Sequence, residues 1–487
     1  MDKSVAPSGK HILQGTAGIL LAEGLMLPTG LLTSAFLTRQ LEPSGYGLFT
    51  LSAAIVAWIE WSIASMFART GVKFVGQAED WRPIGATLIR LYLGTSVVAA
   101  GLLWALAPMV ARVLNEPILS SYLRLFALDI PLFCLGQAHQ NVLMGLGLFR
   151  QRALASAGRW IARLLFIVVL VGAGLSVTGA IVATIGASVV DVTIGRLCVR
   201  PSIYKHEPMP MRQLWGYAIP LFLSALSLRT FDKLDLLSLK ALGGTAEQAG
   251  FYGAAQNLAI IPGLMALSFS PTLLSNLSQF QRLGELDRAK HVARQALRLT
   301  LMLLPLAGLT AGAAPDIVQV IFGDRFLSTA PILAILFFGA ITMVSNSAAT
   351  VILVAAGKPT WTLLVTVPLP ILALVGNLWA IPHLGALGAA SVTASLGVVV
   401  SIVSITLVYH LWQVLPPIAT LVRSLLVSIL IYSVAVAWSV SGLLILVKLT
   451  IASLLIPAMF LALGEFKAKE IHLFLSVIPR VGKRGRQ

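Results

Sequence analysis

Four ionisable residues fall within seven positions of a stretch that is otherwise apolar enough to cross a membrane. They are Arg229, Asp232, Lys233 and Asp235, all within the predicted span 214–240. At about 100° per residue, the four side chains share one arc of a helix, roughly 160° wide. Ionisable groups at membrane depth are costly, so they line a cavity or pair with one another. This arc is therefore the first candidate for a polar binding site.

The chemistry of this arc suits an acidic ligand. Guanidinium and ammonium groups such as those of Arg229 and Lys233 bind the oxygens of a diphosphate or of an acidic sugar. Asp232 and Asp235 would orient these cations or accept hydrogen bonds from the hydroxyl groups of a sugar. A second interpretation stays open, in which Arg229 and Asp232 form an i, i+3 pair that only neutralises itself.

Three acids lie in the predicted spans of the first half of the chain, namely Glu23, Glu60 and Asp129. Glu60 is nearest to mid-span, and it is a candidate both for substrate contact and for coupling, because a buried carboxylate can take up a proton during a transport cycle. Glu23 and Asp129 are further candidates for coupling or gating. The alternative for Glu60 is an ion pair with Arg229 or Lys233, which would still gate a cavity.

Other polar residues in the spans have simpler interpretations. His139, Gln140 and Asn141 stand together in one predicted helix, where they would contact a glycan or, more commonly, tie helices together. Asp191 is expected to pair with a nearby group. Lys448 lies near the beginning of the predicted span 445–464, from which its ammonium group would reach the membrane surface.

The composition of the chain defines the elements that must carry these residues. Of 487 residues, 57% are hydrophobic and 11% charged, whereas soluble domains have roughly 25% charged residues. Marking stretches of about 20 apolar residues predicts about 14 transmembrane helices and no soluble domain. The fold class is therefore an all-α polytopic membrane protein. Two cysteines cannot form a disulfide framework.

The net charge of +16 reflects topology and not nucleic-acid binding, because the basic residues form short clusters between apolar stretches. One side of the predicted membrane carries 27 of the 35 Lys and Arg, including those of the 148–163 connection, and the other side carries five. Both termini are therefore expected in the cytoplasm. The longest outer connections, 241–252 and 322–330, are too short for a folded domain, which disfavours a glycan polymerase or ligase.

The two halves of the chain match at a nearly constant offset. Tyr46-Gly47 corresponds to Tyr252-Gly253 at a shift of 206, and Ala107-Pro108 corresponds to Ala314-Pro315 at 207. Each repeat would hold six helices, so both would enter the membrane from the same side and form two parallel lobes around a central cavity. Such repeats are typical of transporters in which two lobes move about a midplane site.

The predicted organisation follows from the repeat. Its parts are a cytoplasmic N-terminus (1–11), an N-lobe of helices 1–6 (12–198), a cytoplasmic inter-lobe linker (199–213), a C-lobe of helices 7–12 (214–410), two appended helices (421–464) and a basic cytoplasmic tail (465–487).

Three short motifs carry a family resemblance. Arg39-Gln40-Leu41-Glu42-Pro43-Ser44-Gly45-Tyr46-Gly47 resembles the "R-x-L-x-P-x-x-Y-G" turn after helix 1 of bacterial polysaccharide exporters. Asp232-Lys233-Leu234, followed by Leu242-Gly243 and Ala249-Gly250-Phe251-Tyr252, is similar to a second stretch of that family, and Gly145–Arg150 is similar to its turn after helix 4. Over about residues 10–410 the chain thus resembles the Wzx-type lipid-linked oligosaccharide flippases of the multidrug/oligosaccharidyl-lipid/polysaccharide exporter superfamily.

The resemblance implies a flippase without enzymatic activity, which moves a polyprenyl-diphosphate-linked oligosaccharide across the bacterial cytoplasmic membrane by alternating access. It implies the lipid bilayer, the lipid-linked glycan and other polysaccharide-assembly proteins as partners, and no nucleic acid. The family uses no ATP, in agreement with the lack of a G-x-x-x-x-G-K-[ST] loop. No cofactor or metal is expected, only coupling to a proton or cation gradient. The alternatives are a lipid-precursor flippase or a drug/cation antiporter, and less favourably a membrane glycan polymerase or ligase.

Overall fold

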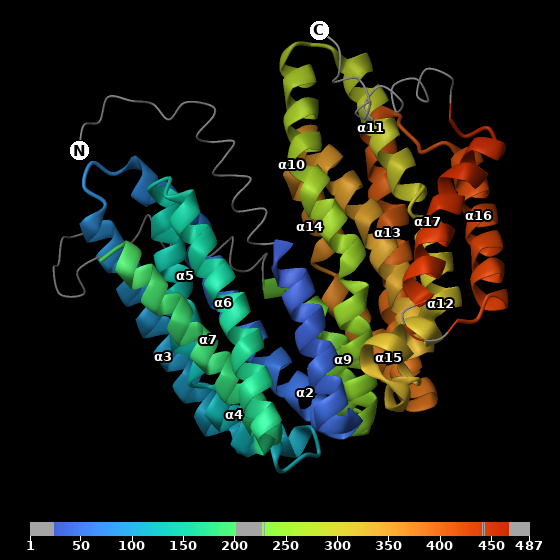
Figure 1. Cartoon of the computed structure of the whole chain (residues 1–487). Coiled ribbons are helices and arrows are strands. Elements are labelled where there is room, and N and C mark those ends of the chain that lie inside the picture. The colour runs from blue at the N-terminus through green and yellow to red at the C-terminus, as the bar shows by residue number, and fades with distance from the viewer. Residues whose placement is uncertain (1–23, 201–225, 228, 441, 443, 467–487) are drawn as a thin grey trace, which may run out of the picture. The chain divides into compact units, whose positions relative to one another are not determined.

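The computed structural model describes residues 24–200, 226–227, 229–440, 442 and 444–466 (Figure 1). Of the described residues 88% are helical, and none of them lies in a strand. Ten helical segments among these residues are long and apolar enough to cross a membrane. The prediction of an all-α polytopic membrane protein is therefore confirmed.

The helices follow one another with short connections. They are α2 (Met26–Gln77), α3 (Arg82–Val113), α4 (Leu119–Phe126), α5 (Asp129–Gly145), α6 (Phe149–Leu170), the π-helix η1 (Val171–Leu175), α7 (Ser176–Cys198), α9 (Ala246–Ala259), α10 (Ile261–Arg282), α11 (Leu286–Leu301), α12 (Leu304–Phe322), the 3-10 helix η2 (Asp324–Phe326), α13 (Thr329–Ala355), α14 (Pro359–Thr366), α15 (Leu369–Trp412), α16 (Ile418–Ala437) and α17 (Leu444–Ala462). Residues 226–227 and 229–241 are helical as well.

Three of the long segments fold back on themselves. The helical φ and ψ angles of α2 are interrupted at Glu42, with φ of 59°, directly before Pro43, which cannot donate a helical hydrogen bond. α15 reverses at Gly385, with φ of 56°. Between α6 and α7 the chain turns at Gly174, with φ of 91°. These reversals add spans beyond the ten membrane-length segments of the described residues. The total of about 14 helices and the six-helix repeats stay predictions.

The surface of α15 shows the inverted polarity of a membrane protein. Ile371, Val375, Leu378 and Trp379 follow one another at helical spacing, and each of these side chains is more than half exposed. A soluble protein would bury such a stripe, so we assign it to the lipid.

The described residues pack into two compact units that are not identical with the predicted lobes. The first unit takes the described residues within 1–259, 321–332 and 363–396, and the second takes those within 260–320, 333–362 and 397–487. Several helices contribute to both. The predicted boundaries of the N-lobe, the C-lobe and the other segments stay predictions, since the units are defined by packing and not by the repeat.

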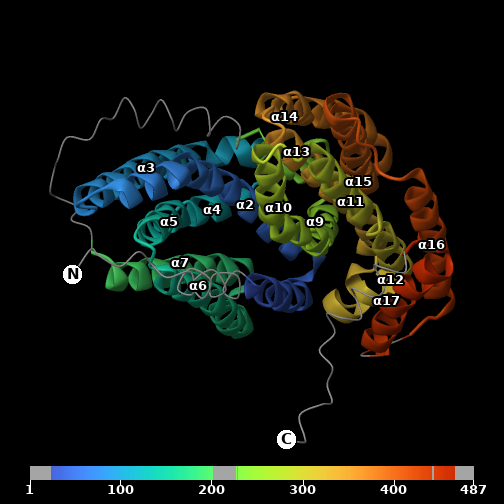
Figure 2. The same ribbon diagram turned by 90° about the horizontal axis from the view of Figure 1, so that it is seen from above.

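The first unit contains α2–α7, α9 and the helix at 229–241. α6 and α7 lie side by side as a hairpin in both views (Figures 1 and 2). α2 packs against α5 and α9. The largest buried side chains of the first unit are aromatic and include Tyr46, Tyr92, Tyr252 and Phe133. These rings fix the helices that carry the candidate site.

The second unit contains two apolar cores. One joins α10, α11, α13 and the second part of α15 around residues such as Leu277, Leu297 and Ile352. The other joins α12 to α16 and α17 around Leu309, Ile431 and Phe460. α16 and α17 lie side by side in both views (Figures 1 and 2).

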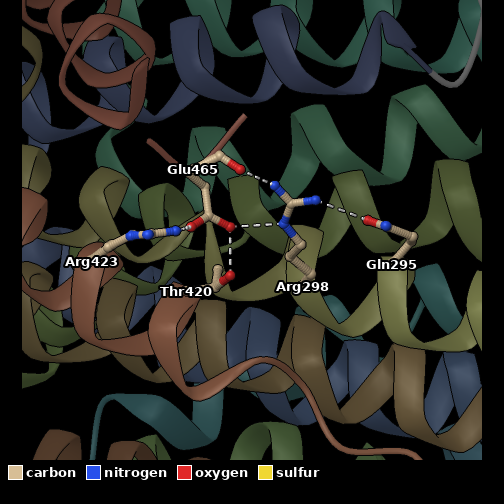
Figure 3. Close-up of polar contacts among 5 residues, drawn as sticks. All are labelled: Gln295, Arg298, Thr420, Arg423 and Glu465. Carbon is tan, nitrogen blue, oxygen red and sulfur yellow. Dashed lines mark hydrogen bonds and ion pairs between the residues drawn. The ribbon is translucent and has the colours of Figure 1, made fainter. Parts of the chain in front are cut away.

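A buried carboxylate ties the end of α17 to two other helices (Figure 3). Glu465 accepts hydrogen bonds from Nε of Arg298 in α11 and from Arg423 in α16, each at 2.7 Å, and from the hydroxyl of Thr420 at 2.5 Å. Arg298 also donates to Gln295 at 3.3 Å. Burial acts to raise the pKa of Glu465, but the hydrogen bonds from Thr420, Arg423 and Arg298 outweigh it, so that this pKa lies below the usual 4.5.

Lys448 makes a second polar tie between α17 and α12. Its side chain is only 1% exposed, and its Nζ lies 2.5 Å from Oδ2 of Asp316. The prediction that Lys448 reaches the membrane surface is therefore wrong. The pairing with Asp316 makes burial of the ammonium group tolerable.

Candidate functional site

Two acids and two arginines meet inside the first unit, and we call them the acid–arginine cluster. It consists of Glu60 of α2, Asp129 of α5, and Arg159 and Arg163 of α6. Glu60 is 5% exposed and Asp129 is 1% exposed. The two carboxyl groups lie within electrostatic range of each other and of both guanidinium groups. The cluster thus balances two negative charges with two positive charges in the interior of a membrane protein.

The sequence explains how the cluster forms. Arg159 and Arg163 are four residues apart, so they project from the same face of α6. Asp129 is the first residue of α5, where the positive end of the helix dipole favours a carboxylate.

Several polar atoms of the cluster make no hydrogen bond of normal geometry. Among the described residues, Oε1 of Glu60, both carboxylate oxygens of Asp129 and Nε of Arg159 and Arg163 are buried without a hydrogen bond. Buried polar groups in proteins are nearly always satisfied. The cluster is therefore chemically suited to bind a proton, water or a polar group of a substrate.

A row of two aromatic rings between two cations leads from the cluster to the arc at 229–235. The guanidinium of Arg159 lies 4.4 Å from the ring centroid of Phe133, whose ring is 5.3 Å from that of Trp61. The guanidinium of Arg229 in turn lies 5.4 Å from the ring of Trp61. Such contacts hold a cation over an aromatic face. We call these four residues the cation–aromatic row.

The outer part of the row is accessible. The side chains of Arg229 and Asp232 are 46% and 52% exposed and form an ion pair of 3.7 Å. The pairing that the sequence left open is thus present, but solvent exposure makes such a pair weak. Lys233 is half-buried on the same helix. Trp61 is 40% exposed, so its ring offers a face to a ligand.

Asp235 has a different environment from the rest of the arc. It is buried, and it accepts hydrogen bonds from the hydroxyl of Tyr252 at 2.6 Å and from Gln256 at 3.1 Å. Thr393 donates to it at 3.4 Å. This carboxylate is thus occupied by neighbours from α9 and α15. Its predicted contact with substrate stays a prediction.

The polar residues of α5 tie helices together, as the sequence indicated. Gln140 donates to Asp191 of α7 at 2.9 Å, and Asn141 donates to the hydroxyl of Tyr92 in α3 at 2.8 Å. His139 lies 2.8 Å from the carbonyl oxygen of Leu135 in its own helix.

The structure brings together some of the predicted site residues and adds others. Glu60 and Asp129 share one cluster, Arg229 is joined to it by the row, and Glu23 lies outside the described residues. Sequence reasoning missed Arg159 and Arg163, because it assigned them to the 148–163 connection. Their i, i+4 spacing between apolar residues was the signal that they belong to a helix. No group of three or more His, Cys, Asp or Glu in the described part of the chain could hold a metal ion.

Apolar helices that fold back in hairpins around buried acids and arginines define a multi-pass membrane protein with a charged interior. The chain matches the family described as "Polysaccharide biosynthesis protein" over residues 36–331, more than half of its length. It belongs to this family. No curated protein matches the sequence.

Solved structures agree in fold. The inward closed conformation of the lipid II flippase MurJ matches with a TM-score of 0.73 and 14% identity, over 92% of this chain and 98% of that chain. An inward-facing multidrug resistance MATE transporter of the MOP superfamily matches with a TM-score of 0.60 and 14% identity, over 81% and 94%. A mutant of the Vibrio cholerae MATE transporter VcmN matches with 0.57 and 16%, over 82% and 96%. The predicted membership of a polysaccharide biosynthesis family is confirmed by the family match, and the fold is that of the MurJ and MATE structures.

Proposed function

We propose that the protein moves a polyprenyl-diphosphate-linked oligosaccharide from the inner to the outer leaflet of a bacterial cytoplasmic membrane by alternating access. The cation–aromatic row is the observation that carries this proposal. It combines guanidinium groups, which bind diphosphate, with aromatic faces, which stack on sugar rings. Membership of a polysaccharide biosynthesis family supports the same substrate class.

The residues divide the binding of such a substrate between them. Arg229 and Lys233 would hold the diphosphate, and Asp232 would release Arg229 from its weak exposed pair when the phosphate arrives. The ring of Trp61 would stack on the first sugar. Glu60 and Asp235 would accept hydrogen bonds from sugar hydroxyls where the substrate reaches them. Arg159 would extend the positive surface inward along the row.

We propose that the acid–arginine cluster couples transport to a proton or cation gradient, without any cofactor. Glu60 and Asp129 are buried next to each other, so adding a proton to one of them changes the charge balance with Arg159 and Arg163. The basic connections on one side support cytoplasmic termini. Other polysaccharide-assembly proteins are proposed as partners through the family alone.

A second candidate function is the flipping of a cell-wall lipid precursor, because the fold resembles that of MurJ, a lipid II flippase. Both candidate substrates are lipid-linked, and the row would suit either of them if it carries a phosphate. A drug or cation antiporter is disfavoured by Arg229 and Arg159, which would repel an organic cation. The short outer connections and the transporter fold support transport over glycan polymerisation or ligation, so we infer that the protein is not an enzyme.

Complementation tests the proposal. The chain is expressed in a panel of flippase-deficient strains that make capsule or O-antigen, and in a strain depleted of its lipid II flippase. Surface glycan is scored by gel. We expect rescue in the panel and a loss of at least about tenfold for Arg229→Ala and Arg159→Ala, the effect of removing a charged hydrogen-bond donor.

Arg124→Ala is the matched control. Arg124 also lies over a tryptophan, at 4.7 Å from the ring of Trp104, but outside the row. This variant should keep full activity at equal protein level. Rescue of only the strain depleted of its lipid II flippase supports the second candidate. Rescue that survives in both arginine variants contradicts the assignment of the row.

A further inference from the structure

We propose that an outer latch closes the protein on the side opposite the predicted cytoplasmic face and opens in each transport cycle. The latch consists of Glu42 with Arg325, Glu116 with Lys240, and the ring of Phe326. All of these residues belong to the first unit. The inference rests on the proposed function, because a latch has a role only where the protein alternates between two states.

The first arm of the latch is the turn after α12. η2 places Phe326, which is fully buried, edge-on to Tyr46 of α2 and to Phe251 of α9, with ring centroids 5.8 Å and 5.7 Å away. The neighbouring Arg325 forms an ion pair with Glu42 at the break in α2. One short turn thus contacts both Tyr-Gly regions of the predicted repeat.

The second arm is the turn after α3. Glu116 of this turn lies 3.0 Å from Nζ of Lys240, at the outer end of the helix at 229–241. The lysine side chain is 5% exposed, and it also donates to the carbonyl oxygen of Gly244 at 3.1 Å. Each arm therefore connects one predicted lobe to the other.

The two arms occupy corresponding places in the predicted repeat. Each turn follows an Ala-Pro pair, 107–108 in the first half and 314–315 in the second. In the first half the turn supplies the acid, Glu116, and in the second half it supplies the base, Arg325. The two arms thus use ion pairs of reversed polarity, in which the turn supplies the acid in one arm and the base in the other.

Between the arms, α2 and α9 meet without room for side chains. A Cβ atom on Gly47 would overlap the carbonyl oxygen of Ala246, and one on Gly250 would overlap that of Pro43. Only glycine permits this approach of two backbones. We call this contact between α2 and α9 the seam. The two backbones close it directly, and the arms hold it closed.

Polar contacts continue the seam inward. Asn257 of α9 donates to the hydroxyl of Tyr46 at 2.8 Å and to that of Ser34 at 3.0 Å. Hydrogen bonds between side chains can break and re-form at modest cost, as an opening seam requires. Ser34 is 7% exposed and precedes Glu42 by eight residues, or about 12 Å of helix. It therefore reports whether the seam beneath the latch is open.

The two ion pairs are not equivalent. The side chains of Arg325 and Glu42 are 70% and 61% exposed, and such surface pairs contribute little. Lys240 is buried, so removing its partner leaves a charge in the protein without compensation. The pair of Glu116 with Lys240 is therefore the dominant electrostatic element of the latch.

Cysteine accessibility tests the latch without any substrate. Ser34→Cys is placed in a background with Cys134→Ala and Cys198→Ala, and spheroplasts are treated with a membrane-impermeant maleimide. We expect Glu116→Gln or Lys240→Met to speed labelling by about tenfold, because the closed state loses a buried pair. Arg325→Gln should change it by less than about threefold.

Charge exchange provides the specific readout. Glu116→Lys combined with Lys240→Glu restores the pair with its charges reversed, and it should return labelling and transport toward the original values. Arg112→Gln, in the last turn of α3 and outside the latch, should change neither. Size-exclusion elution of each purified variant separates opening from unfolding, and Glu116→Gln serves if Lys240→Met does not fold.

Unchanged labelling in folded Glu116→Gln and Lys240→Met would overturn the latch. So would fast labelling that the charge exchange does not reverse, because it would indicate general loosening. Labelling that follows the expected pattern supports the latch even when no lipid-linked glycan is transported. In that case the proposed substrate fails and the latch does not.

Discussion

Nζ of Lys448 lies 2.5 Å from Oδ2 of Asp316, and the lysine side chain is almost completely buried. This pair joins α17 to α12 within the apolar part of the second unit. The network of Glu465 joins the end of the same helix to α11 and α16. The two C-terminal helices are thus fixed by charges near both ends of α17, in addition to their apolar core.

Removing one partner of the Lys448 pair should destabilise the protein strongly. We expect Asp316→Asn or Lys448→Met to lower the free energy of unfolding by about 3 kcal/mol, since each leaves a buried group without its partner. Combining Lys448→Met with Asp316→Leu should recover most of this loss. Thermal unfolding in detergent measures both.

An exposed pair provides the control for this prediction. Glu285 directly precedes α11, and its Oε2 lies 2.8 Å from Nη1 of Arg288 in the first turn of that helix. The two side chains are 35% and 69% exposed. Arg288→Met should change the unfolding free energy by less than about 1 kcal/mol. Equal losses in Arg288→Met and Lys448→Met would contradict a special role for the buried pair.

The sequence predicted the apolar helices well and the buried charges less well. Length and hydropathy are sufficient for spans, because a helix in lipid must satisfy its own backbone hydrogen bonds. The environment of Lys448 could not be found in this way, since its partner Asp316 is 132 residues away. A lysine near a span end has the same local pattern whether it reaches the membrane surface or pairs within the protein.

The candidate site shows the same limit. Arg159 and Arg163 follow a basic connection directly, so the charge count placed them outside the membrane. The acids Glu60 and Asp129 were recognised because an ionisable group within an apolar span stands out by itself. Which of these charges meet depends on the packing of α2, α5 and α6, and no local pattern contains that information.

The stability contributed by Glu465 should be lost in acid. Its pKa in the folded protein lies below the usual 4.5, because three hydrogen-bond donors stabilise the carboxylate against the effect of burial. Its contribution is therefore complete above about pH 4.5 and is lost as the pH falls through the folded pKa. Glu465→Gln should lower stability by roughly 2 kcal/mol near neutral pH and by much less in acid.

Melting temperatures of the original protein and of Glu465→Gln across this pH range check the prediction. Glu285→Gln is the control, as Glu285 pairs with an exposed arginine. A difference between Glu465→Gln and the original protein that grows in acid would give the wrong sign, and the proposed network would not account for it.

Trp61 should matter for transport through its aromatic face. It lies between Phe133 and Arg229 in the cation–aromatic row. Trp61→Leu should reduce surface glycan in a rescued strain by about three- to tenfold, the range of an aromatic contact with a sugar or cation, whereas Trp61→Phe should retain most of it. Trp104→Leu removes the ring beneath Arg124 and should have no effect. Equal activity of Trp61→Leu and Trp61→Phe would show that only apolar volume is needed there.

Glu60 should carry the pH dependence of transport, if the acid–arginine cluster couples the cycle to protons. Its buried carboxyl faces Asp129, Arg159 and Arg163, so one proton changes the balance between two acids and two bases. Glu60→Gln fixes the neutral form with the same shape, and it should leave transport independent of external pH, at a reduced rate. Glu285→Gln, far from this cluster in the sequence and in an exposed pair of the second unit, should keep the original pH profile. Glycan export across a pH series measures the profile. If Glu60→Gln keeps the original profile, Glu60 is not the coupling site, and Asp129→Asn is the next variant to test.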